Sequence, residues 1–228
     1  MISIIIPTLD EEVYIARLLD HLLYNIRDRS AEIILVDGGS RDHTLEIAQS
    51  YPIRIFETSV ASRAMQMNTG AQEAQGNILY FVHADVLPPA SFLDDIHKHF
   101  SKGCRAGMFR QKFEGGPWLL QINSFLTRFD WEWTRGGDQT LFVDNNLFQS
   151  LGGYDEHFVV MEEYEFLRRL RKKADLCIVR SFTLVSSRKY IKNSYFKVVY
   201  AYFIAHKMFR EGKDPAQIKE VYQSMLEV

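Results

Sequence analysis

Asp85 stands where a side chain could hold a divalent cation. It follows a short apolar run, residues 78–82, whose β-branched and aromatic side chains are typical of a strand buried on both faces of a parallel sheet. In open α/β sheets, ligands bind beyond the carboxyl ends of the strands. A cation held there could neutralise a diphosphate. The alternative is structural, because Asp85 could simply end the strand or cap a turn.

Polar residues also follow two earlier apolar runs. Residues 2–6 lead into Pro7, Thr8 and an acidic triplet at 10–12, and residues 32–36 lead into the segment D-G-G-S-R-D at 37–42. Acids at the start of a helix favour its dipole, which could explain the triplet. The two glycines allow a tight turn before the next helix, which Ser40 or Asp42 could cap.

A further acidic segment opens a predicted helix at 161–172. Glu162, Glu163 and Glu165 stand at its start, and four basic residues stand at its end. Acids first and bases last complement the helix dipole, and this alone could account for the glutamates.

The elements that must position these residues follow from hydrophobic periodicity. Strands are predicted at 2–6, 32–36, 53–56 and 78–82, alternating with helices at 13–23, 44–49, 62–75 and 92–100. Because the strands are apolar throughout, the pattern predicts a doubly wound, mostly parallel, Rossmann-like α/β sheet with helices on both faces. Gly76 is expected to close the third helix at its C′ position. Neither G-x-G-x-x-G nor a P-loop motif follows a strand, which argues against an ordinary dinucleotide fold and a P-loop NTPase.

The chain beyond Lys102 is less regular. Strands are predicted at 104–113, 141–143 and 177–185, and a glycine-rich loop at 135–138. Helices are predicted at 118–133 (one or a pair), 146–151, 161–172, 195–210 and 215–226.

Composition limits the class of protein. A chain of 228 residues that is 46% hydrophobic can form one domain, with or without a small appendage. A net charge of -2, from 27 basic and 29 acidic residues, argues against nucleic-acid binding. Cys104 and Cys177 fall in predicted strands, so we expect buried thiols and a reducing compartment. We expect no signal peptide and no membrane span, because no basic leader or ~20-residue apolar run occurs.

Five motifs in order resemble family 2 glycosyltransferases of the GT-A fold, the nucleotide-sugar-dependent type. They are P-T-L-D-E-E (7–12), V-D-G-G-S-R-D (36–42), H-A-D (83–85), G-G-Y-D-E (152–156) and M-E-E-Y-E-F-L-R-R-L (161–170). R-A-M-Q-M-N-T-G-A (63–71), G-D-Q (137–139) and S-R-K-Y (187–190) are similar to a subgroup of short bacterial and archaeal members.

The resemblance implies a nucleotide site. Its expected residues are Pro7, Thr8, Asp10, Glu11, Asp37, Arg63, Asn68 and His83. Asp10 replaces the family's common Asn and, as a carboxylate, cannot donate a hydrogen bond. Gly38 stands where many members have a second Asp. Asp85 matches the last acid of the D-x-D motif, so it is the expected ligand of Mn²⁺ or Mg²⁺, and His83 replaces the first acid.

The resemblance also implies the catalytic base. Glu163 matches the second acid of the family's E-D pair, which takes the acceptor hydroxyl's proton in an inverting transfer, and Glu162 ranks second. Asp138 and Gln139 are candidates to face the acceptor, unless their segment is simply a turn. Arg188 and Lys189 could hold the leaving diphosphate, or they could be solvated surface charge.

Aromatic stripes run along the predicted helices at 118–133 and 195–210, the second with Lys and Arg around it. Such stripes are usually core or a homodimer contact, and a basic aromatic helix could instead rest on a membrane that carries a lipid-linked acceptor.

We expect a catalytic domain at 1–190 and a helical extension at 191–228 packed on it. The expected protein is a cytoplasmic, metal-dependent glycosyltransferase, with a peripheral membrane location as the alternative. The rival hypotheses are a pyrophosphorylase, whose Gly-rich basic loop is missing at 8–11, and a catalytically impaired nucleotide-binding relative.

Overall fold

The computed structural model describes residues 1–27, 29–131, 134–135 and 139–227. Within them, eight strands form one sheet in the order β3-β2-β1-β4-β7-β6-β8-β5. The strands are β1 (Ile2–Thr8), β2 (Ala31–Asp37), β3 (Arg54–Glu57), β4 (Ile78–Phe81), β5 (Val86–Leu87), β6 (Ala106–Glu114), β7 (Leu141–Asp144) and β8 (Leu176–Ser186). β1 to β4 are parallel, and β6 is parallel to β8. The predicted α/β class is therefore confirmed.

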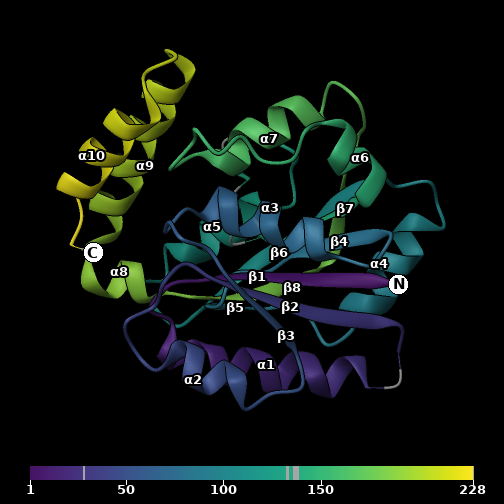
Figure 1. Cartoon of the computed structure of the whole chain (residues 1–228). Coiled ribbons are helices and arrows are strands. Elements are labelled where there is room, and N and C mark those ends of the chain that lie inside the picture. The colour runs from purple at the N-terminus through teal and green to yellow at the C-terminus, as the bar shows by residue number, and fades with distance from the viewer. Residues whose placement is uncertain (28, 132–133, 136–138, 228) are drawn as a thin grey trace.

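Helices cover both faces of the sheet (Figure 1). The face below the sheet in that view carries α1 (Glu12–Ile26) and α2 (Thr44–Gln49), and α4 (Phe92–Phe100) packs into the same core cluster. The other face carries α3 (Arg63–Glu73), α6 (Asn145–Ser150) and α7 (Glu162–Leu170). Strand β1 is buried along its whole length, which explains why its residues do not alternate between apolar and polar.

Helix α3 lies unusually close to the sheet at Gly70. A Cβ built on Gly70 would lie 2.4 Å from a methyl carbon of Ile5, so any larger residue would push α3 away from β1. The helix ends at Glu73, and Ala74 is already extended. The prediction that Gly76 closes this helix is wrong. Gly76 instead donates its N–H to Ser3 Oγ at 2.8 Å, where a Cβ would collide with Ser3.

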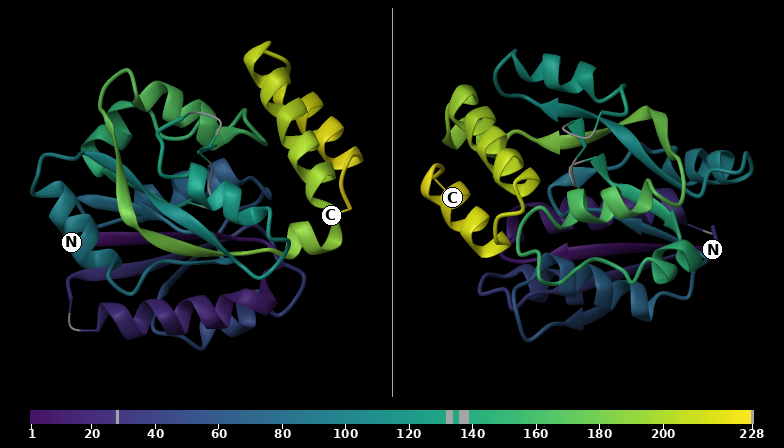
Figure 2. Two further views of the ribbon diagram at one scale, coloured as in Figure 1. Left: turned by 180° about the vertical axis from the view of Figure 1, so that it is seen from behind. Right: turned by 90° about the horizontal axis from the view of Figure 1, so that it is seen from above.

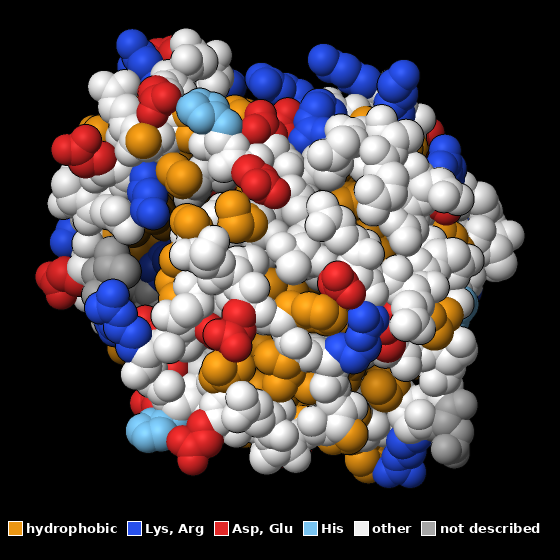
Figure 3. Space-filling model, viewed as in Figure 1, with side chains coloured by type: hydrophobic (Ala, Val, Ile, Leu, Met, Phe, Trp, Pro, Cys, Tyr) orange, Lys and Arg blue, Asp and Glu red, His pale blue; other side chains and the backbone are white. Residues whose placement is uncertain are grey.

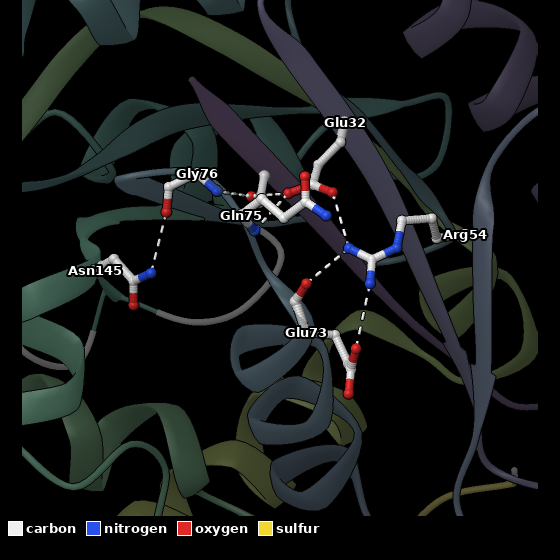
Figure 4. A network of polar contacts seen from close by, with 7 residues as sticks. Glu32, Arg54, Glu73, Gln75, Gly76 and Asn145 are labelled. Carbon is white, nitrogen blue, oxygen red and sulfur yellow. Dashed lines mark hydrogen bonds and ion pairs between the residues drawn. The ribbon is translucent and has the colours of Figure 1, made fainter.

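A polar network at the amino edge of the sheet joins β1, β2, β3 and α3 (Figure 4). Glu32 accepts hydrogen bonds from Ser3 Oγ at 2.6 Å, from the N–H of Gln75 at 2.7 Å and from Arg54 at 3.0 Å. Arg54 also donates to the carbonyl and the carboxylate of Glu73. Each charged group in this network has an internal partner, so the network stabilises this edge of the sheet.

Two features of the sheet were not predicted. β7 is antiparallel to both of its neighbours, β4 and β6, and the two-residue β5 pairs with β8 at the far edge. β5 is too short to carry a periodic signal, and the direction of β7, a strand predicted at 141–143, depends on how the chain returns to the sheet.

The expectation of two buried thiols is wrong. Cys104 and Cys177 form a disulfide with a Cα–Cα separation of 6.3 Å, although 73 residues separate them in sequence. Cys104 lies just before β6, and Cys177 lies opposite Gly107 in the neighbouring parallel strand β8. Strand pairing therefore brings the two cysteines together, and the inferred reducing compartment loses its support.

The C-terminal helices lie at the carboxyl edge of the parallel strands (Figures 1 and 2). They are α8 (Arg188–Lys192), α9 (Tyr195–Arg210) and α10 (Pro215–Ser224), and α5 (Leu120–Leu126) packs on β6 near the start of α9. Ala205, Phe209 and Ile218 pack with Met161, just before α7. The aromatic stripe of α9 is divided, because Phe209 is buried whereas Phe196 is 73% exposed.

No helix in the described part of the chain is long and apolar enough to cross a membrane. On the face seen in Figure 3, acidic and basic side chains are interspersed and hydrophobic side chains gather in separate patches. The division at residues 190 and 191 stays a prediction; it falls inside α8.

Candidate active site

The carboxyl ends of β1, β2 and β4 meet at one edge of the sheet. Thr8 lies opposite Asp37, and Phe81 lies opposite Ile5, so the segment after β4 leaves the sheet beside the ends of the other two strands. This edge brings together polar residues that the sequence places far apart, as expected for parallel strands.

Asp37 stabilises the turn after β2. The residue is 1% exposed, and its carboxylate accepts from the N–H groups of Gly39 and Ser40 at 2.8 Å each and from the hydroxyls of Ser40 and Thr8. Gln66 of α3 donates to the carbonyls of Thr8 and Val36. Pro7 is buried in β1. In this conformation Asp37 is an internal acceptor, and its contact with a nucleotide base or ribose stays a prediction.

Asp10 connects the two strand-end loops. Its carboxylate accepts from the N–H of Arg41 at 2.7 Å, and its own N–H donates to Ser40 Oγ at 3.0 Å. Its φ of 54° lies in the left-handed region, which Asp and Asn tolerate better than most residues. Asp42 accepts from the N–H groups of Glu12 and Thr44, so one carboxylate stabilises the starts of α1 and α2.

Arg188 joins two of the predicted acids. It forms a bidentate pair with Glu11, at 2.9 and 2.7 Å, and its Nη2 lies 3.2 Å from Asp85 Oδ2. The guanidinium also lies over the ring of Tyr14. Burial lowers the pKa of Arg188, but the hydrogen bonds to Glu11 and the charge of Asp85 outweigh it, so the pKa is raised. The positive charge of Arg188 therefore lies beside Asp85, the carboxylate that is predicted to bind a metal ion.

Glu163 faces the strand end that leads to Asp85. Its Oε1 lies 3.0 Å from Nε2 of His83, two residues before Asp85, and both side chains are largely buried. The neighbouring Glu162 is more buried and pairs with Arg63 of α3 at 3.1 Å. Thus Glu163 lies against the predicted nucleotide residue His83, whereas Glu162 joins α3 to α7.

Three of the four described non-glycine residues with a positive φ, Asp10, Thr140 and Met161, lie at this edge, and the fourth, Arg27, lies between α1 and β2 at the other edge. Met161, which precedes α7, has a φ of 66°, and Thr140, which precedes β7, has a φ of 56°. Thr140 is β-branched, so this conformation is costly, by about 1–3 kcal/mol. Tyr80 Oη lies 3.0 Å from the Thr140 hydroxyl in the buried core, which helps to hold it. Strained residues of this kind are often found at functional sites.

Asn68 does not lie beside these residues. Its side-chain amide donates to the carbonyl of Tyr154 and to Glu156, and its oxygen accepts from the N–H of Tyr154. Asn68 therefore fixes the G-G-Y-D-E loop onto α3. A cavity of about 560 Å³ lies next to it, lined also by Gln72, Glu165 and Arg169. These lining residues lie outside the Asp85–His83–Glu163 group, and we assign the cavity no function.

The remaining candidates separate in space. Gln139 is 2% exposed and uses its amide to bond Arg135 and the carbonyl of Thr134. Lys189 donates to Tyr202 Oη at 2.9 Å and also lies over the ring of Tyr222, so it ties α8 to the last two helices. Asp138 lies outside the described residues. Roles for Gln139 and Lys189 toward an acceptor or diphosphate stay predictions.

Sequence reasoning missed Gln66 and Arg135, which shape this edge, and considered Ser40 only as a helix cap. Gln66 lies in the motif at 63–71 and Ser40 in the motif at 36–42. The two motifs therefore could have identified both residues. Arg135 is fully buried, and its side chain bonds the carbonyls of Thr127 and Phe129. Burial lowers the pKa of Arg135 to about 10. No local pattern distinguishes such an arginine from a solvated one.

Solved structures share this architecture. The mannosyltransferase PcManGT from Pyrobaculum calidifontis, in complex with GDP-Man and Mn²⁺, has a TM-score of 0.70 at 18% identity, covering 98% of this chain and 68% of that chain. Staphylococcus aureus TarS 1–349 has a TM-score of 0.67 at 18% identity, covering 98% of this chain and 70% of that one. The fold is the GT-A fold of glycosyltransferases.

The sequence assigns the family. The Glycosyl transferase family 2 profile matches residues 3–163, and the chain belongs to that family. It is 24% identical over 198 residues to the poly(ribitol-phosphate) beta-N-acetylglucosaminyltransferase TarS of Staphylococcus aureus (strain MW2), which covers 76% of this chain and 34% of TarS. The chain thus spans about a third of the length of that curated relative.

Proposed function

We propose that the protein is an inverting glycosyltransferase that moves a sugar from a nucleotide diphosphate sugar to an acceptor hydroxyl. Family membership and the GT-A fold support the reaction class. The observation that carries the assignment to particular residues is the 3.0 Å contact between His83 and Glu163, two residues from Asp85. It joins the strand end expected on the leaving side with the acid expected on the attacking side.

Glu163 is the base in this proposal. The acceptor oxygen attacks C1 of the sugar and forms the new C–O bond, the C1–O bond to the diphosphate breaks, and Glu163 takes the hydroxyl proton. The nucleoside diphosphate leaves with the bonding electron pair. His83 positions Glu163 by contacting Oε1, which orients the carboxylate before the acceptor arrives.

Thr8, Asp10, Glu11 and Asp37 line the nucleotide side in this proposal. Their loops are held by Asp37, Ser40 and Gln66, so the backbone there is preorganised. Arg63 is 55% exposed and lies at the start of α3, where it could reach a phosphate while Glu162 orients it.

A divalent cation fits one part of this site. The described residues contain no group of three or more His, Cys, Asp or Glu side chains that could hold a metal ion. Mg²⁺ is commonly held by only one or two carboxylates together with substrate phosphates, and Asp85 supplies one such carboxylate. When bound, the cation would neutralise the leaving diphosphate. Until then Arg188 keeps Asp85 compensated at 3.2 Å.

Donor binding and turnover test the proposal directly. UDP- and GDP-sugars are titrated with and without Mn²⁺, with the melting temperature and release of free nucleotide as readouts. We expect one nucleotide class to stabilise the protein and to be released slowly by hydrolysis. Binding without release, across an acceptor panel, would identify instead a nucleotide-binding relative that has lost catalysis.

A further inference from the structure

Five arginines gather around β6, β8 and the segment after α5. They are Arg110 on β6, Arg128 and Arg135 after α5, Arg171 at the end of α7, and Arg180 on β8. Among the described residues, Asp130 is the acid that pairs with members of this group: its Oδ1 lies 2.5 Å from Arg171 and 3.5 Å from Arg135 Nε. The group therefore carries positive charge that its own carboxylate does not neutralise.

Three members of the group form a surface cluster: Arg110, Arg128 and Arg180. The pairing of β6 with β8 shifts between Phe109 and Arg110, so that Arg180 and Ser181 form a bulge between Val179 and Phe182, the partners of these two residues. The N–H of Gln111 donates to Thr127 Oγ1, which brings Arg128 to the same place. Arg128 and Arg180 are exposed, whereas Arg110 is half-buried.

None of the three has a carboxylate partner among the described residues. Arg110 Nε is buried and has no hydrogen-bond partner within the described part of the chain. Burial, together with the charges of Arg128 and Arg180, lowers the pKa of Arg110. The three guanidinium groups thus repel one another, and a bound anion would relieve both the repulsion and the unmet donor.

Strand register relates the cluster to Glu163. Met108 of β6 and Phe81 of β4 both pair with Leu141 of β7, and both strands run in the same direction. Arg110 follows Met108 by two residues, and His83 follows Phe81 by two residues, so the two lie at a similar height in the sheet. Phe81, Met108 and α7 share one core cluster. Arg110 therefore lies level with the histidine that contacts Glu163, in the part of β6 that runs on beside β8.

We propose that Arg110, Arg128 and Arg180 form a subsite for a phosphate group carried by the acceptor. This inference rests on the proposed function, because it names the class of acceptor. Guanidinium groups match phosphate oxygens through paired N–H donors, and a phosphate dianion suits three converging cations better than a carboxylate does. The donor's diphosphate belongs to the other side of the site, beside Asp85 and Arg188. The phosphorylated acceptor is either a soluble phosphate ester or a lipid phosphate.

Phosphate binding tests the subsite without any turnover. Inorganic phosphate and glycerol 3-phosphate are titrated by calorimetry into protein already saturated with UDP or GDP and Mn²⁺. Arg128→Ala/Arg180→Ala should weaken binding roughly tenfold or more, as expected for the loss of two charge-assisted hydrogen bonds. Arg105→Ala is the matched control, since Arg105 is exposed just before the same strand and pairs with Asp144. The double variant uses exposed residues, so its folding does not depend on replacing the half-buried Arg110.

A phosphate affinity that is the same in the wild type and the double variant would overturn the subsite, as would no binding by the wild type. Transfer to acceptors in matched pairs, with and without the phosphate, separates this proposal from the previous one. Equal transfer to both members of each pair overturns the phosphate subsite while the glycosyltransferase assignment stands. The third outcome is that phosphate binding requires the arginines but the protein releases no nucleotide from any donor. This result would support the anion subsite and contradict the proposed glycosyltransferase activity.

The source of the phosphate is separated by a vesicle assay. If the ligand is a lipid phosphate, phosphatidylcholine vesicles that contain phosphatidic acid should retain the wild type and not the double variant, and glycerol 3-phosphate should compete weakly. If it is a soluble ester, glycerol 3-phosphate should bind equally with and without vesicles.

Discussion

The two edges of the sheet use charge differently. At the amino edge, Glu32 and Arg54 are bonded to each other and to the backbone around them, and Arg105 pairs with Asp144. At the carboxyl edge, Arg188 is shared between two acids and Glu163 contacts an imidazole. The buried Nε of Arg110 has no hydrogen-bond partner among the residues that the structure describes.

The difference indicates which edge is built for ligands. A network whose members satisfy one another stabilises the fold but offers nothing to a ligand. The carboxyl edge instead keeps charges that an incoming phosphate, sugar or cation could take over, and it holds the strained backbone of Met161 and Thr140. Substitutions at this edge should therefore change activity, and substitutions at the amino edge should change stability.

The largest effect is expected from Glu163→Gln. The amide keeps the size of the side chain but cannot accept the acceptor's proton, so transfer should fall roughly a hundredfold or more with donor binding nearly intact. Steady-state transfer and donor titration measure the two quantities. Glu162→Gln is the control, and it should lose less transfer but lower the melting temperature, because Glu162 is buried against Arg63. Equal transfer by Glu163→Gln and the wild type would remove Glu163 from the mechanism.

Asp85→Asn should have the next largest effect. The amide removes the charge that a cation needs, and binding of UDP or GDP in the presence of Mn²⁺ should weaken roughly tenfold or more. Binding without Mn²⁺ should change less. Nucleotide titration with a circular-dichroism check of folding measures this. Unchanged Mn²⁺-dependent affinity would show that Asp85 serves only to hold Arg188.

Arg188→Lys sharpens the comparison within α8. Lysine keeps the charge but loses the planar fork that joins Glu11 and Asp85, so kcat/KM should fall about tenfold. Lys189→Gln is the matched neighbour: its ammonium faces Tyr202 and Tyr222, so the variant should lower the melting temperature and reduce donor hydrolysis less than Arg188→Lys does. A reversed pattern, with hydrolysis sensitive to Lys189 and not to Arg188, would contradict the placement of Arg188 at the site.

Glu32→Gln should have the smallest effect on activity and a clear effect on stability. Burial raises the pKa of Glu32, but the hydrogen bonds from Ser3, Gln75 and Arg54 outweigh it and lower the pKa below its ordinary 4.5. A lowered folded-state pKa stabilises the protein above pH 4.5, and this stabilisation is lost as the pH falls through the folded value. Urea unfolding should show a deficit of about 1–3 kcal/mol at pH 7 that shrinks below pH 4.5.

Glu73→Gln is the control for that measurement, because the Glu73 side chain is 44% exposed and should contribute less. A Glu32→Gln deficit that persists unchanged at pH 3 would show that shape rather than charge holds the amino edge together.

Local sequence patterns determined most of the elements. The apolar run at 2–6 lies within β1, the run at 32–36 lies within β2, and the predicted helix at 195–210 matches α9. Hydrophobic periodicity acts over a few residues, so it identifies a buried strand or an amphipathic helix wherever the element is long enough. The same patterns placed Asp37, Asp85 and Glu163 at the end of a strand or the start of a helix.

Tertiary structure decided which of these residues meet. His83 and Glu163 are 80 residues apart, and Arg188 and Glu11 are 177 residues apart. The disulfide and the arginine cluster depend on the pairing of β6 with β8, which leaves no local signal. The sequence alone determined that acids and bases follow the strands. The fold decided that Arg188 pairs with Glu11 and Asp85, whereas its neighbour Lys189 contacts two tyrosines. The reason is that burial and strand order act between residues that are far apart in the chain.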